Sequence, residues 1–231
     1  MTKQKLPRGL WFDIDGIDGA GKTTLVSLLH RFFCGLDDSV KMEFKKHPIV
    51  HTKEPTYITE AGQNIRRILQ TDSNPVENGE LLLNLYFEDR KIHQDKLITP
   101  ALEQRCLVIN DRGELSSFAY QWEQLKQAEI DQEKAFDMIF ERSQKVKRPS
   151  FYIVIDTPAD IAIERMRREG RGTQKFEKDL AFLEKVRKNY LELQVKLPKE
   201  KYNIKVISGN QQKEQVFQQA LAYFKGEYYK R

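Results

Sequence analysis

The sequence has very little cysteine. Its 231 residues include only Cys34 and Cys106, which belong to no C-x-x-C pair and have no histidines at the spacing of a metal site. This excludes a disulfide framework and gives no sign of a zinc site. We therefore expect a reducing compartment and a cytoplasmic location, with the fold held by its hydrophobic core.

Long apolar runs are also absent. The N-terminal stretch MTKQKLPRGLWFDIDG lacks the apolar segment of about 7 residues found in secretion signals, and no segment approaches the roughly 18 apolar residues of a membrane helix. We expect neither secretion nor a membrane partner. The chain also lacks repeats, low-complexity tracts and Pro/Gly/Ser-rich linkers, which favours a single domain over residues 1–231.

Neither sign of charge is in large excess. Lysine and arginine total 39 against 34 aspartate and glutamate, a net charge of +5. This mild excess suits an anionic partner without identifying one, so nucleic acid, acidic lipid and phosphorylated metabolites all stay open at this point.

The apolar pattern that is present alternates short buried runs with helical periodicity. Strands are predicted near 10–14, 49–52, 106–109, 151–155 and 204–207, and helices near 22–33, 61–69, 79–97, 115–126, 133–144, 158–168, 176–193 and 211–224. The third helix is expected to break at Thr99-Pro100 and to continue briefly to Gln104. This alternation predicts an α/β fold, with five mainly parallel strands covered by helices on both faces.

One contiguous motif carries chemistry. Residues 16–23 match G-x-x-x-x-G-K-[ST] between the first predicted strand and the first predicted helix. Backbone N–H groups and the helix dipole bind phosphates there, Lys22 reaches the β- and γ-oxygens, and the Thr23 hydroxyl binds Mg²⁺. The residues expected to bind ATP are Gly16, Ile17, Asp18, Gly19, Ala20, Gly21, Lys22, Thr23 and Thr24.

A second metal ligand is predicted at Asp111, just after the third strand, where phosphate-loop enzymes place an acidic residue toward Mg²⁺. Without the loop, an aspartate there would more often be a helix cap. No N-K-x-D guanine signature is present, which argues against a GTPase switch.

Several further motifs resemble those of the thymidylate kinase family. They are the phosphate loop at 15–23, Thr-Lys-Glu-Pro at 52–55, Gly-x-x-Ile-Arg at 62–66, Tyr86 with Arg90, Pro-Ala-Leu at 100–102, and Asp-Arg-x-x-x-Ser-x-x-Ala-Tyr-Gln at 111–121. The resemblance implies a three-layer P-loop fold with a lid at about 165–178. It further implies a homodimer that transfers phosphate from ATP to dTMP for dTTP biosynthesis.

In that family, matching positions contact the acceptor nucleotide. The resemblance assigns this role to Asp18, Lys53, Glu54, Tyr86, Arg90, Arg112, Ser116, Ser117, Tyr120 and Gln121. Tyr86 and Arg90 stand four residues apart and share a helix face, so they can grip one base, although periodicity alone would place Tyr86 in the core. Arg112 is expected at the acceptor phosphate, where a surface ion pair is the alternative.

The lid prediction concerns the basic segment 164–179. Gly19 stands where some relatives carry an arginine in the phosphate loop, so the resemblance implies that Arg165, Arg168, Arg171 or Lys175 closes on ATP. The expected catalytic residues are Lys22, Arg112, Asp18, Arg168 and Arg171. These assignments direct the lysines and arginines of the site toward two small phosphate-bearing ligands. The remaining positive charge gives no support to nucleic-acid binding, so we expect no nucleic-acid partner.

Three alternatives stay open. A deoxynucleoside kinase would need a base for a neutral 5′-hydroxyl, and Glu54 could serve. A deoxynucleoside monophosphate kinase could prefer another base, since the family pattern is altered at Thr56-Tyr57, Gly113 and Trp122-Glu123. An ATP sensor would bind without turnover.

Overall fold

A five-stranded sheet forms the centre of the structure, a computed structural model that describes residues 9–35, 47–71, 78–170 and 180–230. Its strands are β1 (Leu10–Asp15), β2 (Ile49–Lys53), β3 (Leu107–Asp111), β4 (Phe151–Asp156) and β5 (Ile204–Ser208). The order is β2-β3-β1-β4-β5 and all four pairings are parallel. The predicted fold class is confirmed, and every strand lies within two residues of its expected position.

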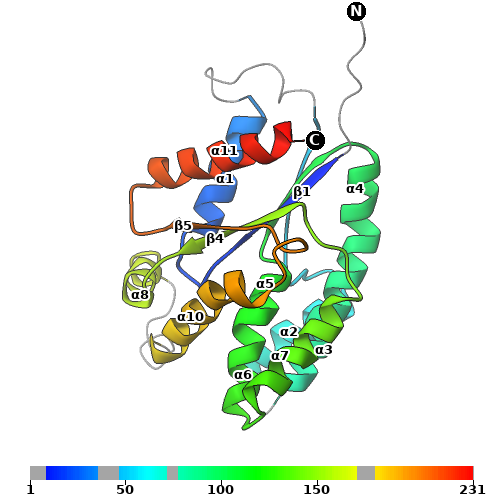
Figure 1. Cartoon of the computed structure of the whole chain (residues 1–231), viewed down its shortest axis with the longest axis vertical. Coiled ribbons are helices and arrows are strands. Elements are labelled where there is room, and N and C mark those ends of the chain that lie inside the picture. The colour runs from blue at the N-terminus through cyan, green and yellow to red at the C-terminus, as the bar shows by residue number, and fades with distance from the viewer. Residues whose placement is uncertain (1–8, 36–46, 72–77, 171–179, 231) are drawn as a thin grey trace, which may run out of the picture.

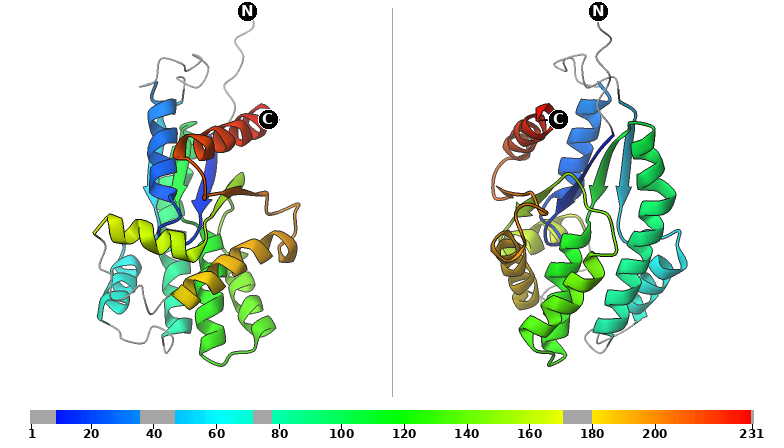
Figure 2. Two further views of the ribbon diagram at one scale, coloured as in Figure 1. Left: turned by 90° about the vertical axis from the view of Figure 1, so that its left-hand side faces the viewer. Right: turned by 45° about the vertical axis from the view of Figure 1, so that its right-hand side comes forward.

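Helices cover both faces of this sheet (Figures 1 and 2). The N- and C-terminal helices α1 and α11 lie side by side on one face, and the other face carries the helices between β2 and β5. The helical segments are α1 (Lys22–Phe33), α2 (Glu60–Thr71), α3 (Gly79–His93), η2 (Gln94–Ile98), α4 (Thr99–Glu103), α5 (Glu114–Ser116), η3 (Ser117–Gln121), α6 (Trp122–Gln127), α7 (Gln132–Ser143), α8 (Ala159–Arg168), α10 (Leu180–Lys196) and α11 (Lys213–Tyr229).

The expected break at Thr99-Pro100 is wrong. The chain passes from α3 through the π-helical turn η2 directly into α4. Pro100 has no N–H to donate and its ring crowds the preceding turn of an α-helix. The π turn interrupts the regular i to i−4 hydrogen bonds just before this residue, as the Thr99 N–H bonds to the Gln94 carbonyl, five residues back. The helix therefore accommodates the proline without stopping.

The core sits between the sheet and both helical layers. Phe12 in β1 stacks on Phe151 in β4 with ring centroids 4.9 Å apart, and Phe224 of α11 packs on Phe33 of α1 at 4.6 Å. β1 and β3 are buried along their whole length, so their carboxyl ends are fixed in position. Ligands of open parallel sheets bind at this edge.

Two observations concern the other sequence predictions. The lid positions 171–178, including Arg171 and Lys175, lie outside the described residues. Among the helices that are described, none is long and apolar enough to cross a membrane.

Candidate active site

The phosphate loop connects β1 to α1 with the geometry that the motif predicts. A side chain at Gly19 is excluded, because a Cβ there would lie 2.3 Å from the Ala162 carbonyl oxygen of α8. Gly21 precedes α1 in a left-handed conformation and no side chain caps this helix. Backbone donors at its N-terminus therefore face the loop, where they favour an anion.

Lys22 is folded into this loop. Its ammonium group donates to the carbonyl oxygens of Ile17 at 2.7 Å and Gly16 at 3.0 Å. Burial, together with the charge of Arg112, lowers the pKa of Lys22 to about 7. The arrangement holds an ammonium group beside the backbone donors of the loop, where both can attract an anion.

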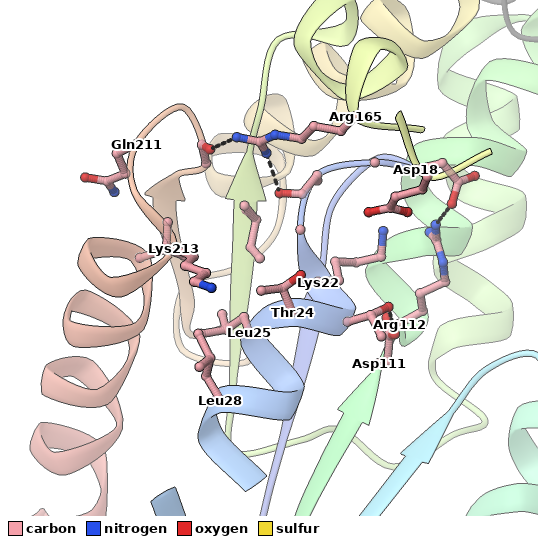
Figure 3. Close-up of a pocket in the computed structure, with 18 of the residues that line it drawn as sticks. Asp18, Lys22, Thr24, Leu25, Leu28, Asp111, Arg112, Arg165, Gln211 and Lys213 are labelled. Atoms are coloured by element: carbon pink, nitrogen blue, oxygen red, sulfur yellow. Dashed lines mark hydrogen bonds and ion pairs between the residues drawn. The ribbon is translucent and has the colours of Figure 1, made fainter. Parts of the chain in front are cut away.

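A pocket of about 370 Å³ opens above the loop (Figure 3). Asp18, Asp111 and Arg112 lie on one side of it, and Gln211 and Lys213 on the other. Its lining residues are Asp18, Gly19, Ala20, Gly21, Lys22, Thr23, Thr24, Leu25, Leu28, Lys53, Asp111, Arg112, Ile155, Arg165, Glu169, Gly209, Gln211, Gln212, Lys213 and Val216. Its size matches a small-molecule site.

The wall of the pocket formed by residues 209–213 and Val216 was not predicted from the sequence. This segment follows β5 and closes the pocket opposite the phosphate loop, where Arg165 of α8 bridges the two by donating to the carbonyl oxygens of Gly209 at 2.9 Å and Ala20 at 3.4 Å. The signal was present, because the residues after every strand of a parallel sheet meet at one edge.

Thr23 and Asp111 form a pair that fits a divalent cation. The Thr23 hydroxyl lies 3.2 Å from Asp111 Oδ2. Asp111 Oδ1 is buried and has no hydrogen-bond partner among the described residues. A hydroxyl beside an unsatisfied carboxylate oxygen is a suitable donor set for Mg²⁺, which binds few protein ligands and shares the rest with phosphates and water. No cluster of three acidic, histidine or cysteine ligands occurs in the described part of the chain.

Arg112 connects the phosphate loop to the segment after β3. Its guanidinium forms an ion pair with Asp18 and lies 5.3 Å from the centre of the Tyr120 ring. The Tyr120 hydroxyl in turn accepts a hydrogen bond from the Asp18 N–H at 3.0 Å. Burial raises the pKa of the Asp18 carboxyl, but the charges of Arg112 and Lys22 outweigh it and bring the pKa down to about 2.

A second group of predicted residues lies around Arg90. Arg90 is 2% exposed and donates to Glu54 Oε2 at 2.7 Å, to the Gly113 carbonyl at 2.9 Å and to the Ser117 hydroxyl at 3.2 Å. Tyr86 is half-buried one turn earlier on α3, and burial raises the pKa of its hydroxyl to about 12. Ser117 and Gln121 are the ends of the π-helical turn η3, a feature frequent at functional sites.

Glu54 is a poor general base. Its second oxygen, Oε1, lies 3.0 Å from His93 Nδ1, so both oxygens are engaged. Burial alone would raise the pKa of this carboxyl, but the charge of Arg90 is the main influence that offsets it. The net pKa is below its ordinary value. A base must have a free oxygen and a pKa near neutral, so the environment of Glu54 disfavours the deoxynucleoside kinase alternative.

The remaining predicted residues are placed as follows. Ser116 donates to Asp15 Oδ1 at 2.7 Å, behind Arg112. Lys53 is exposed at the end of β2 and lines the pocket. Arg168 is exposed at the end of α8, outside the pocket lining, and forms an ion pair with Glu164.

The geometry agrees with comparisons to known proteins. The family model described as "Thymidylate kinase" matches residues 14–220. The chain belongs to the thymidylate kinase family. It is 30% identical to "Thymidylate kinase" of Acinetobacter baumannii over 217 residues, which cover 93% of this chain and 99% of that relative. It is 33% identical to "Probable thymidylate kinase" of Pyrococcus horikoshii over 197 residues, 83% of this chain and 85% of the relative.

A solved structure supports the fold assignment for this member of the family. The crystal structure of thymidylate kinase from Ehrlichia chaffeensis matches 94% of this chain and all of that one, with a TM-score of 0.68 and 22% sequence identity. At that identity the likeness concerns the fold, and it extends over nearly the whole chain.

Proposed function

We propose that this protein is a dTMP kinase, which transfers the γ-phosphoryl group of ATP to dTMP and yields dTDP and ADP for dTTP biosynthesis. Membership of the thymidylate kinase family supports the reaction class. One structural observation carries the proposal: Arg112 and Asp18 line the pocket above the phosphate loop and both contact Tyr120, so the residues proposed for the donor and for the acceptor meet at one point.

The donor nucleotide binds with its phosphates over Gly16 to Thr24. Lys22 exchanges the two loop carbonyls for the β- and γ-oxygens. Arg165 and residues 209–213 face the other end of the pocket, which suits the base and ribose of ATP. Thr23 and Asp111 hold Mg²⁺, which when bound offsets the negative charge of the phosphates.

The acceptor nucleotide binds with its base between Tyr86, Arg90, Ser117 and Gln121. Tyr120 and Asp18 adjoin the sugar, Glu54 and Ser116 hold the two arginines from behind, and Lys53 and Arg112 bind the phosphate. Arg90 has N–H groups left after its three internal bonds, because a guanidinium has five donors. These can meet a carbonyl at the edge of the base.

The reaction is an in-line displacement that needs no general base. The acceptor phosphate oxygen is already ionised near neutral pH and forms a bond to the γ-phosphorus, while the bond from that phosphorus to the β,γ-bridging oxygen breaks and its electron pair leaves with ADP. Lys22, Arg112 and a cation from the lid, Arg168 or Arg171, spread the charge that develops. Positioning and a dry electrostatic environment supply the acceleration.

We further propose a single cytoplasmic kinase domain that forms a homodimer. Leu81 and Ile92 are 49% and 36% exposed on one face of α3, which gives a second copy an apolar surface to cover. Light scattering with Leu81→Glu/Ile92→Glu tests this, because two charges on that face would convert a dimer to monomer, and a monomeric wild type would exclude it.

The decisive assay is ADP release from MgATP with dTMP, dUMP, dCMP, dGMP or thymidine as acceptor. We expect the highest kcat/KM with dTMP. Turnover of thymidine without dTMP would support a nucleoside kinase instead, preference for another monophosphate would reassign the base, and ATP binding without any turnover would support a sensor.

A further inference from the structure

The residue that joins the two halves of the site has a strained backbone. Arg112 has a φ of 73°, in the left-handed region that residues with a side chain rarely occupy. Such a conformation costs about 1–2 kcal/mol and persists only where neighbouring groups enforce it. It points the Arg112 side chain toward Asp18 and the phosphate loop, rather than continuing the direction of β3.

All four backbone polar groups of Arg112 and Gly113 are bonded. The Arg112 N–H donates to the Ile14 carbonyl at 2.9 Å, and the Arg112 carbonyl accepts from the Asn110 side-chain amide at 2.6 Å. The Gly113 N–H donates to Asp15 Oδ1 at 3.3 Å, and the Gly113 carbonyl accepts from Arg90 at 2.9 Å. The bond from Asn110 is the shortest of the four.

Asn110 is itself held in one orientation. It lies in β3 directly opposite Asp13 of β1, is 0% exposed, and its Nδ2 donates to Asp13 Oδ1 at 3.2 Å as well as to Arg112. Both neighbours of Nδ2 are acceptors, so exchanging the amide oxygen and nitrogen would set acceptor against acceptor. The Trp11 ring N–H donates to the same Asp13 oxygen, Oδ1, at 2.6 Å and so helps to fix the carboxyl.

The amide orientation leaves Asn110 Oδ1 buried without a partner among the described residues. An unsatisfied acceptor costs about 1–3 kcal/mol, so a purely structural role at this position would be met better by an apolar residue. Gly113 belongs to the same arrangement, because a Cβ there would lie 1.8 Å from Asp13 Oδ2. The Asp13 carboxyl occupies the space that a side chain at 113 would need.

We propose that Asn110 is a positioning residue for phosphoryl transfer: its amide, oriented by Asp13, holds the left-handed backbone of Arg112 and thereby aims the guanidinium at the acceptor phosphate. This role rests on the proposed function, since it acts through Arg112. Asn110 does not touch either nucleotide in this scheme. Its loss therefore changes the use of the acceptor and leaves ATP binding intact.

The test is steady-state kinetics of Asn110→Ala with each nucleotide varied in turn. We expect kcat/KM for dTMP to fall about 10- to 100-fold, as for a catalytic group displaced by about 1 Å, while KM for ATP stays within about twofold. Asp13→Asn keeps the oxygen that accepts from Asn110 and should retain wild-type kinetics within about threefold. If Asn110→Ala does not fold, Asn110→Ser replaces it in the test and is judged by the same criteria. Serine has one hydroxyl donor and cannot donate to both Asp13 and the Arg112 carbonyl.

Gln94→Ala is the matched control. Gln94 is also a buried amide that holds backbone, bonding the Lys147 N–H at 2.8 Å and its carbonyl at 3.0 Å, and it is not among the residues that line the pocket. We expect a lower Tm in this control with unchanged kinetics. Wild-type kcat/KM for dTMP in Asn110→Ala, or a KM for ATP that rises as much as the KM for dTMP, would overturn the inference alone. A wild type that phosphorylates none of the five acceptors would overturn the proposed function, and the inference with it.

Discussion

The ammonium group of Lys22 lies 2.7 Å from the carbonyl oxygen of Ile17, inside the loop proposed to bind the phosphates of ATP. Lys22 is buried beside Arg112, and its pKa is lowered to about 7. Phosphates bound in the loop would add negative charge beside Lys22 and so raise its pKa. Nucleotide binding and protonation of Lys22 are therefore coupled.

Proton uptake on MgATP binding follows from this coupling. At pH 8 most of Lys22 is neutral in the free protein and charged in the complex, so we expect uptake of up to about one proton per site. At pH 6 Lys22 is already charged and the uptake should nearly vanish. Calorimetric titrations at both pH values, in buffers of different ionisation enthalpy, measure it. Equal heats in all buffers at pH 8 would contradict the lowered pKa.

Lys22→Ala is expected to abolish phosphoryl transfer. The Lys22 ammonium bonds the loop carbonyls directly and is proposed to stabilise the transferring phosphate, so a loss of about 1000-fold or more in kcat is expected. Far-UV circular dichroism should match the wild type, because the bonds of this side chain within the described part of the chain are to two carbonyl oxygens of a loop, those of Gly16 and Ile17. Residual activity near the wild-type rate would refute the assignment of the phosphate loop.

Arg112→Lys tests the planar contact with the acceptor phosphate. Lysine keeps the charge but loses the paired donors of a guanidinium. We expect kcat/KM for dTMP to fall about 100-fold while KM for ATP changes little. Arg142→Lys is a suitable control, since Arg142 lies on α7 and bonds Asn84 and the Met138 carbonyl outside the site. Equal effects in the two variants would mean that Arg112 forms only a surface ion pair.

The roles proposed for the three arginines of the lid segment, Arg165, Arg168 and Arg171, can be distinguished by comparing the effects of their substitution on kcat and on KM. Arg165 lines the pocket, so Arg165→Ala should raise KM for ATP about tenfold. Arg168 and Arg171 are proposed to reach the phosphates only when the lid closes, so Arg168→Ala and Arg171→Ala should lower kcat more than they raise KM. Single-turnover rates measured with both nucleotides saturating distinguish an effect on the chemical step from an effect on KM. Wild-type kcat in both lid variants would remove these residues from the mechanism.

The donor half of the site could be predicted because its information is local. Residues 16–23 form one contiguous motif between a strand and a helix, and Asp111 is the last residue of the neighbouring strand β3. The environment of Arg90 depends instead on Glu54 and Gly113, which lie 36 and 23 positions away. Residue spacing carries no information about such partners, so the burial of Arg90 required the three-dimensional structure.

Gly113 shows the same limit of prediction from sequence. The sequence shows that the family pattern is altered to glycine at this position, but only the structure shows that the Asp13 carboxyl occupies the space of the side chain. Similarly, Pro100 predicts a helix end, and the π turn that prevents it depends on packing of the whole helix.

Glu114, the residue after Gly113, makes stability depend on pH. It is 1% exposed and accepts a hydrogen bond from Tyr152, and burial raises its pKa to about 7. Between its ordinary pKa, near 4.5, and about 7 the unfolded chain releases this proton while the folded chain keeps it. The folded state then binds more protons, so the free energy of unfolding falls as pH rises through this window.

Glu114→Gln should flatten that dependence. Above pH 7 the full pKa shift of Glu114 corresponds to about 3 kcal/mol in the free energy of unfolding. Burial also raises the pKa values of Asp13 and Asp15, so these two residues add a pH dependence of the same sign, which remains in the variant. Urea unfolding at pH 5, 6, 7 and 8 measures the slope. The exposed Glu103, substituted as Glu103→Gln, should retain the wild-type slope. Parallel slopes for wild type and Glu114→Gln would show that Glu114 is ionised in the folded protein throughout this range.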